Sequence, residues 1–255
     1  MTYYIGMDIG STCTKTAVLD EEKEICDLIV KPTGWSSVDT AEGLKQELEE
    51  KGYLAGGTRL VSTGYGRASV AFADKNVTEI TCHARGAGFI HQTDDLIVID
   101  IGGQDTKLIL LENGMVSDFM MNDKCSAGTG RFLEVMANTL GVNIDQLCDL
   151  ASKGGGVAIS SMCTVFAESE VISLIGRGER KENIAFGIIE SIVQKVATQA
   201  TRWQLNRHDV CLTGGLYRFD YIRARLSEKL GVPVSTHEAG YFAGAIGAAL
   251  SAYTI

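Results

Sequence analysis

Residues 97–107 read IVIDIGGQDTK and residues 5–15 read IGMDIGSTCTK, at a constant offset of 92 positions. Six of the eleven paired positions are identical, and they include the whole D-I-G triplet. In each copy an apolar run rich in aromatic or β-branched residues precedes the triplet and a second apolar run follows it, which predicts a β-hairpin. We interpret the copies as an internal duplication that gives two related α/β lobes, each opening with such a hairpin.

The turns of both hairpins have the chemistry of a phosphate site. Glycine allows a close backbone approach, and successive turn N–H groups bind an anion. The aspartate that ends each first strand is an oxygen ligand that holds Mg²⁺ through water. Two facing hairpins would hold one nucleotide, ATP or ADP with Mg²⁺, in a cleft between the lobes. The expected phosphate-binding residues are Gly10, Ser11, Thr12, Cys13, Thr14, Lys15, Gly102, Gly103 and Gln104.

Three hairpin residues are candidates for catalysis. Asp8 and Asp100 would orient Mg²⁺, and Gln104 would position the attacking water, as carboxamides do in other nucleotide hydrolases. A simple hydrogen bond to phosphate is an equal alternative for Gln104. Lys15 and Lys107 are both candidates to neutralise phosphate, although either is equally read as a surface charge beyond the turn; position favours Lys15.

A third glycine element reads VCLTGGL over residues 210–216. An apolar strand ends at Thr213, and the corner formed by Gly214 and Gly215 would let the backbone lie flat against a base or ribose. We therefore expect this corner to bind the adenosine side of the nucleotide.

Periodicity predicts the helices and the division of the chain. Apolar residues at helical spacing indicate helices over 41–51, 131–140, 165–175, 183–206, 219–230 and 240–253. We expect an N-terminal lobe over residues 1–92, with the C-terminal helix 241–255 packing back onto it, and a second lobe over residues 93–240. The predicted fold class is α/β, with duplicated lobes and an interlobe nucleotide cleft.

The composition is that of a globular chain with an ample core. Of the 255 residues 45% are hydrophobic and only two are prolines. The formal net charge of −9 disfavours nucleic acid and anionic membranes as partners. The N-terminus lacks the basic start and apolar run of a signal peptide, and no apolar run is long enough to span a bilayer. We therefore expect a cytoplasmic protein.

The motifs taken together resemble one family. The paired D-I-G hairpins and the late T-G-G are similar to the superfamily of acetate kinase, sugar kinases, Hsp70 and actin, whose lobes are ribonuclease-H-like. The chain is identified more narrowly as resembling the activating ATPases of 2-hydroxyacyl-CoA dehydratases, of the BadF/BadG/BcrA/BcrD type. The segments that carry this resemblance are DIGSTCTK at 8–15, STGYGR at 62–67, EITCHARGA at 79–87, DIGGQDTK at 100–107, NDKCSAGTGRF at 122–132 and the Cys163 segment before AESE.

The resemblance implies a role for two of the seven cysteines. In that family each subunit supplies two cysteines, and a homodimer shares one [4Fe–4S] cluster across its twofold axis. The matching positions here are Cys125 and Cys163. Such a cluster takes four thiolates, and a twofold axis doubles what one chain offers. Both cysteines precede predicted helices, whose N-termini favour thiolates.

The other cysteines have plainer interpretations, since no CxxC pair exists and a reducing cytosol disfavours disulfides. Cys13 lies in the first phosphate turn and would contribute its backbone. Cys82 adjoins His83 without further ligands nearby, so we expect packing or a hinge at His83 instead of a metal. The cysteines expected as small buried hydrophobes are Cys26, Cys148 and Cys211.

The resemblance implies an ATPase that passes one electron to a separate iron–sulfur dehydratase acting on a 2-hydroxyacyl-CoA, with a reduced ferredoxin or flavodoxin as donor. Hydrolysis would move the helices that carry Cys125 and Cys163, and Asp123 would link nucleotide to cluster. An exposed cluster also implies an anaerobic host.

Two other functions remain open on the sequence. One is a sugar or amino-sugar kinase of the same superfamily, although we recognise no general base for a hydroxyl acceptor. The other is a nucleotide-dependent switch without redox chemistry, in which the cysteines belong to the core.

Overall fold

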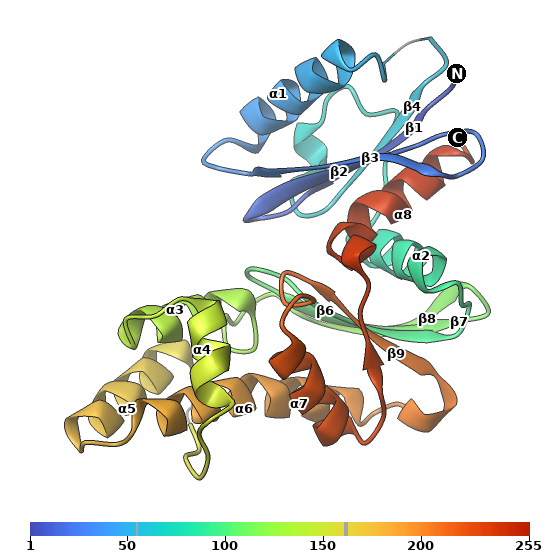
Figure 1. Cartoon of the computed structure of the whole chain (residues 1–255). Coiled ribbons are helices and arrows are strands. Elements are labelled where there is room, and N and C mark those ends of the chain that lie inside the picture. Colours follow the sequence, from blue (N-terminus) through green and yellow to red (C-terminus); the bar gives the residue numbers. More distant parts are fainter. Residues whose placement is uncertain (55, 161–162) are drawn as a thin grey trace. The chain divides into compact units, whose positions relative to one another are not determined.

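A computed structural model describes residues 1–54, 56–160 and 163–255 (Figure 1). The chain forms two compact units. The first consists of Met1–Val98, Ile109–Phe119 and Ala239–Ile255, and the second of Ile99–Leu108 and Met120–Glu238. Each unit contains one D-I-G turn and the glycine-rich segment that packs against it.

The first five-stranded sheet contains the first hairpin. Its strand order is β3-β2-β1-β4-β5. The strands are β1 (Tyr4–Ile9), β2 (Cys13–Leu19), β3 (Ile25–Pro32), β4 (Arg59–Thr63) and β5 (Lys75–Asn76). β1 and β2 are antiparallel, with Asp8 opposite Lys15, whereas β4 runs parallel to β1. The D-I-G turn therefore lies at the carboxyl end of β1, beside the end of β4.

Helices cover this sheet, and glycines let two of them approach closely. The helices are α1 (Ser37–Glu50), α2 (Glu79–His91) and α8 (Ala243–Ala252), and α8 packs against α2, β1, β2 and β4 (Figure 1). A Cβ on Gly6 would lie 1.9 Å from the carbonyl oxygen of Ala245, and one on Gly247 would lie 1.8 Å from that of Cys82. Because these positions lack a Cβ, the backbone of α8 lies directly on β1 and on α2.

The second sheet repeats the strand order of the first. Its strands are β6 (Leu96–Ile101), β7 (Thr106–Glu112), β8 (Met115–Asn122), β9 (Asp209–Gly214) and β10 (Val234–Ser235). The order β8-β7-β6-β9-β10 corresponds strand by strand to β3-β2-β1-β4-β5. The duplication inferred from eleven paired positions therefore extends over both sheets and is confirmed.

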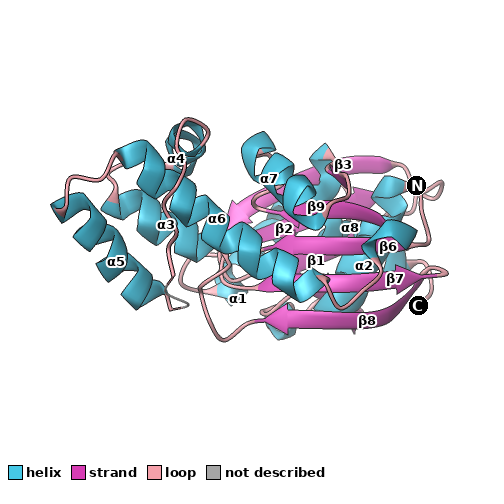
Figure 2. Ribbon diagram, turned by 90° about the horizontal axis from the view of Figure 1, so that it is seen from below, coloured by secondary structure: helices cyan, strands magenta, loops and turns pink. Residues whose placement is uncertain are grey.

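Among the described residues, five α-helices complete the second unit. They are α3 (Gly130–Thr139), α4 (Ile144–Ala151), α5 (Thr164–Gly176), α6 (Lys181–Ala200) and α7 (Asp220–Leu230). Figure 2 shows α3, α4, α5 and the first part of α6 as a helical group beyond the strands. The helix predicted over 183–206 ends earlier, at Ala200, and a short 3-10 helix follows at Leu205–Arg207. Two more 3-10 helices lie at Arg67–Ser69 and Glu238–Phe242. No helix in the described part of the chain has the length and apolar character of a membrane span.

Candidate functional site

Asp8 lies near the end of β1 as a buried carboxylate, and one of its oxygens has no hydrogen-bond donor among the described residues. The residue is 3% exposed, and its Oδ1 accepts no hydrogen bond from the residues that the structure describes. A Cβ on Gly64 would lie 2.4 Å from Oδ1, and one on Gly244 would lie 2.5 Å from Oδ2. A buried charge is costly unless it is paired or coordinates a metal. An oxygen left in this state fits the ligand shell of hydrated Mg²⁺.

Thr33 forms two hydrogen bonds with the backbone of the first turn. The Thr33 hydroxyl donates to the carbonyl oxygen of Gly10 at 2.7 Å, and its N–H donates to that of Thr12 at 2.9 Å. Ser11 and Thr12 are exposed at the tip of the turn. The Lys15 ammonium lies 4.5 Å from the ring centroid of Tyr241. The turn thus exposes its tip and the positive charge of Lys15 lies against an aromatic ring.

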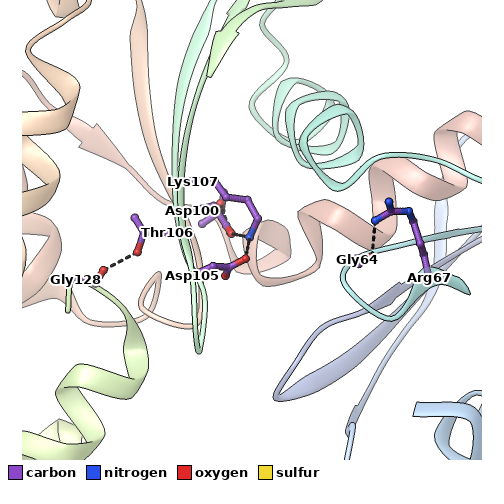
Figure 3. Close-up of polar contacts among 8 residues, drawn as sticks. Gly64, Arg67, Asp100, Asp105, Thr106, Lys107 and Gly128 are labelled. Atoms are coloured by element: carbon purple, nitrogen blue, oxygen red, sulfur yellow. Dashed lines mark hydrogen bonds and ion pairs between the residues drawn. The ribbon is translucent and has the colours of Figure 1, made fainter. Parts of the chain in front are cut away.

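Asp100, the counterpart of Asp8 in the second hairpin, is fully partnered. Its Oδ1 accepts from the Thr213 hydroxyl at 2.8 Å, and its Oδ2 lies 3.2 Å from the Lys107 ammonium. Lys107 also contacts Asp105 at 2.7 Å and is only 1% exposed (Figure 3). Lys107 is therefore a buried counter-ion and not a surface charge. The two aspartates occupy equivalent positions of the sequence repeat, but Asp100 has a partner at each oxygen, whereas Oδ1 of Asp8 has none among the described residues.

The second turn is closed by its own side chains. The N–H of Gly102 donates to the carbonyl oxygen of Asp105 at 2.9 Å, and a Cβ on Gly102 would lie 2.3 Å from Asp105 Oδ1. Gln104 is exposed in this turn. The side chain of Gln104, which we predict to position water, is therefore accessible to solvent. Position 102 requires glycine, because the carboxylate of Asp105 packs against it.

The third glycine element lies directly against the second hairpin. Gly214 has a φ of +77°, and a Cβ there would lie 2.4 Å from the carbonyl oxygen of Ile101 and 2.9 Å from Asp100 Oδ1. The N–H of Gly215 donates to the same Ile101 carbonyl at 3.0 Å. The corner that the sequence predicts for adenosine therefore adjoins Asp100.

A matching corner lies in the first unit, where Gly64 ends a short apolar strand of the sequence. Gly64 follows β4 with a φ of +88°, and a Cβ there would lie 2.6 Å from the carbonyl oxygen of Ile9. The Arg67 guanidinium donates to the Gly64 carbonyl at 3.1 Å (Figure 3). Thr63-Gly64 thus repeats Thr213-Gly214, and the signal for it was a T-G pair at the end of an apolar strand.

The cysteine-bearing segment 125–130 is hydrogen-bonded to the second turn. The N–H of Gly130 donates to the Gly102 carbonyl at 2.9 Å, and the N–H of Arg131 donates to that of Gly103 at 2.8 Å. The Thr106 hydroxyl donates to the Gly128 carbonyl at 2.5 Å (Figure 3). These contacts join the second D-I-G turn to the segment that contains Cys125. Asp123 is exposed, before that segment.

Cys125 and Cys163 belong to neighbouring loops of the second unit. Cys125 is half-buried, whereas Cys163 is exposed and is the N-cap of α5. The Ser126 and Thr164 hydroxyls, one residue beyond each cysteine, are 2.8 Å apart. No group of three or more histidine, cysteine or acidic side chains suited to a metal occurs in the described ranges. Two accessible thiols are half of the donor set that a [4Fe–4S] cluster takes, so the residues fit a cluster shared by two chains.

The other cysteines divide into buried and accessible thiols. Cys148 and Cys211 are buried, as predicted, and burial raises the pKa of Cys148 to about 12 and also raises that of Cys211. Cys82 is buried as well, and desolvation raises its pKa to about 11. The prediction for Cys26 is wrong, because this residue is exposed on β3, an edge strand of its sheet. Cys13 is half-buried in the first turn.

Comparisons with known proteins agree with this geometry. The pattern of the BadF/BadG/BcrA/BcrD ATPase family matches residues 5–252. The (R)-2-hydroxyglutaryl-CoA dehydratase activating ATPase of Acidaminococcus fermentans is 44% identical over 254 residues, which cover 98% of this chain and 97% of the relative.

Solved structures match over nearly the full length of the chain. The crystal structure of the Acidaminococcus fermentans (R)-2-hydroxyglutaryl-CoA dehydratase component A matches with a TM-score of 0.91, covering 100% of this chain and 98% of that one. The activator of 2-hydroxyisocaproyl-CoA dehydratase from Clostridium difficile, with bound ADPNP, is 37% identical and has a TM-score of 0.87, covering 99% and 94%. A ROK family glucokinase from Streptomyces griseus, 14% identical with a TM-score of 0.64, shares the fold alone and covers 99% and 100%. The predicted fold class is confirmed.

Proposed function

The chain belongs to the BadF/BadG/BcrA/BcrD ATPase family, as its motifs predict, and from this premise we propose that it is an ATP-hydrolysing iron–sulfur activator. It passes one electron to a 2-hydroxyacyl-CoA dehydratase and is reduced in turn by a ferredoxin or flavodoxin. Its relatives of known role activate dehydratases of this class. The observation that carries the proposal is the hydrogen-bonded connection from the second turn to the segment of Cys125.

The nucleotide part of the proposal rests on the two turns. Gly10–Lys15 and Gly102–Gln104 would bind the phosphates, and Gly214 and Gly215 the adenosine side. Asp8 would hold Mg²⁺ through water, since its Oδ1 accepts no hydrogen bond from the described residues. Gln104 is exposed and would position the attacking water.

The redox part rests on the thiols of two chains. Cys125 and Cys163 would bind one half of a [4Fe–4S] cluster, and the same residues of a second copy would bind the other half. The cluster supplies one-electron chemistry. Cys163 is the N-cap of α5, and Cys125 lies in the segment that leads into α3.

Coupling would run through backbone hydrogen bonds. Phosphate bound at Gly102 and Gly103 would shift the carbonyl groups that accept from Gly130 and Arg131, and with them the start of α3. The Ser126–Thr164 contact would carry this shift to the start of α5. We also propose Asp123 as a link between the nucleotide and the cluster, because it lies two residues before Cys125.

Docking would use exposed apolar side chains on α5, the helix that begins directly after Cys163. Helix α5 exposes four large apolar side chains, which is unusual for a helix of a soluble unit. They are Val165, Phe166, Ile172 and Ile175. We assign this face to the contact between copies and to the transient contact with the dehydratase.

The test is a metal analysis of anaerobically purified protein. We expect about four iron atoms and four sulfides per dimer, with brown absorption. Cys125→Ala and Cys163→Ala should abolish the cluster and leave the fold intact, whereas Cys26→Ala, on an exposed thiol of the first unit, should retain it. Full iron in both loop variants would overturn the ligand assignment. A colourless protein whose ATP turnover rises with a hydroxyl acceptor would instead be a kinase, and ATP binding without iron would indicate a switch.

A further inference from the structure

His83 is a buried imidazole close to Asp8. It lies on α2, is 6% exposed, and faces helix α8 at Gly244. A Cβ on Gly244 would lie 2.7 Å from Cε1 of His83 and 2.5 Å from Oδ2 of Asp8. Both side chains therefore approach the same point, at a position where α8 has no side chain.

The local packing leaves the imidazole little freedom. A Cβ on Gly86 would lie 1.9 Å from the carbonyl oxygen of Ala243, and Gly247 touches the backbone of Cys82 in the same way. The two helices thus meet backbone to backbone on both sides of His83. A side chain between two such close backbone contacts has little room to change its orientation. His83 can therefore fix the orientation of a neighbouring ligand side chain.

The two oxygens of Asp8 have different surroundings. Oδ1 faces Gly64 and accepts no hydrogen bond from the described residues, whereas Oδ2 faces Gly244 and the His83 ring. A partial rotation of the carboxylate plane about the Cβ–Cγ bond would move both oxygens away from these positions. A rigid imidazole beside Oδ2 opposes that rotation.

We propose that His83 is a positioning residue for nucleotide hydrolysis, which fixes the orientation of the Asp8 carboxylate and so the hydrated Mg²⁺ that accompanies the nucleotide. The inference rests on the proposed nucleotide chemistry of Asp8 but not on the iron–sulfur cluster. It replaces the expectation that His83 serves only in packing or as a hinge.

The experiment measures ADP affinity by calorimetry as a function of free Mg²⁺, with the anaerobic dimer. His83→Leu should raise about tenfold the Mg²⁺ concentration at which ADP affinity reaches half of its maximal increase. This is the effect expected when the hydrogen-bonding or packing partner of a metal ligand is removed. His83→Gln, which keeps a donor, should recover part of the loss. His91→Leu makes the same change at the far end of α2 and should leave the midpoint unchanged.

A purely structural role predicts another pattern. His83→Leu would then lower the melting temperature and the ADP affinity alike at every Mg²⁺ concentration, and that result overturns the proposal, as does an unchanged midpoint. If His83→Leu does not fold, His83→Gln decides the question: a raised Mg²⁺ midpoint with an unchanged melting temperature supports the proposal, and an unchanged midpoint overturns it. Failure of the wild-type protein to bind ADP at all would instead remove the proposed function.

Discussion

The hydroxyl of Ser126 lies 2.8 Å from the hydroxyl of Thr164, although 38 positions separate them in the sequence. Each residue directly follows one of the two cysteines proposed as cluster ligands. Ser126 belongs to the segment that is hydrogen-bonded to the second D-I-G turn, and Thr164 opens α5. This contact therefore links the segment of Cys125 to the start of the helix that follows Cys163.

A double-mutant cycle on this pair tests the connection. Ser126→Ala and Thr164→Val should each destabilise the fold by about 1 kcal/mol, the usual net contribution of one hydrogen bond. The double variant should be little worse than either single one, because the contact is already lost. Urea unfolding gives the stabilities, and iron release to a chelator gives the effect on the cluster. Additive losses would show that the two residues act independently.

Lys107→Met tests the buried ion pair beneath the second turn. Removing the ammonium leaves the Asp100 carboxylate buried at 3% exposure without its counter-ion. Breaking such a pair on one side costs about 3–5 kcal/mol. Chemical unfolding should show this loss, and a second change, Asp100→Asn, should restore part of it. Lys15→Met is the matched control in the first hairpin, where we expect weaker nucleotide affinity and little loss of stability.

The sequence repeat predicted both hairpins and the fold, because strand, turn and strand are encoded within eleven residues. It did not predict that Asp8 and Asp100 differ, since their partners are distant in the chain: Thr213 lies 113 positions beyond Asp100. Local pattern carries no information on such pairs. The sequence of α8 shows that its residues are small and apolar. It does not show that Gly244 packs against Asp8 and His83, which come from distant parts of the chain.

The cysteines also show which features can be predicted from local sequence and which cannot. Cys148 and Cys211 occur in apolar surroundings along the chain and are buried, as expected. Cys26 lies in a strand whose alternation is weak, and its exposure follows from the edge position of β3, which the local sequence does not encode.

Asp8→Asn should have opposite effects on stability and on binding. In the nucleotide-free protein Oδ1 is buried without a donor, so removing the charge should stabilise the fold by about 1–2 kcal/mol. Without the carboxylate the Mg²⁺ dependence of ADP affinity should disappear. Chemical unfolding and calorimetry measure the two effects. Asp100→Asn is the control and should destabilise instead, because Asp100 has two partners. A destabilised Asp8→Asn protein would contradict our view of this carboxylate.

The buried thiols should make the free energy of unfolding decrease at alkaline pH. Burial raises the pKa of Cys82 to about 11 and that of Cys148 to about 12, from an ordinary value of 9.0, because desolvation disfavours thiolate. Between pH 9 and these values the unfolded chain binds fewer protons than the folded one, so stability falls as pH rises. Each thiol contributes a slope of about 1.4 kcal/mol per pH unit in that window. Unfolding measured from pH 8 to 11 should therefore show a decline that Cys148→Ala makes shallower, while Cys26→Ala, at an exposed site, changes it far less. Equal slopes in the wild type and in Cys148→Ala would contradict the assignment of this decline to the Cys148 thiol.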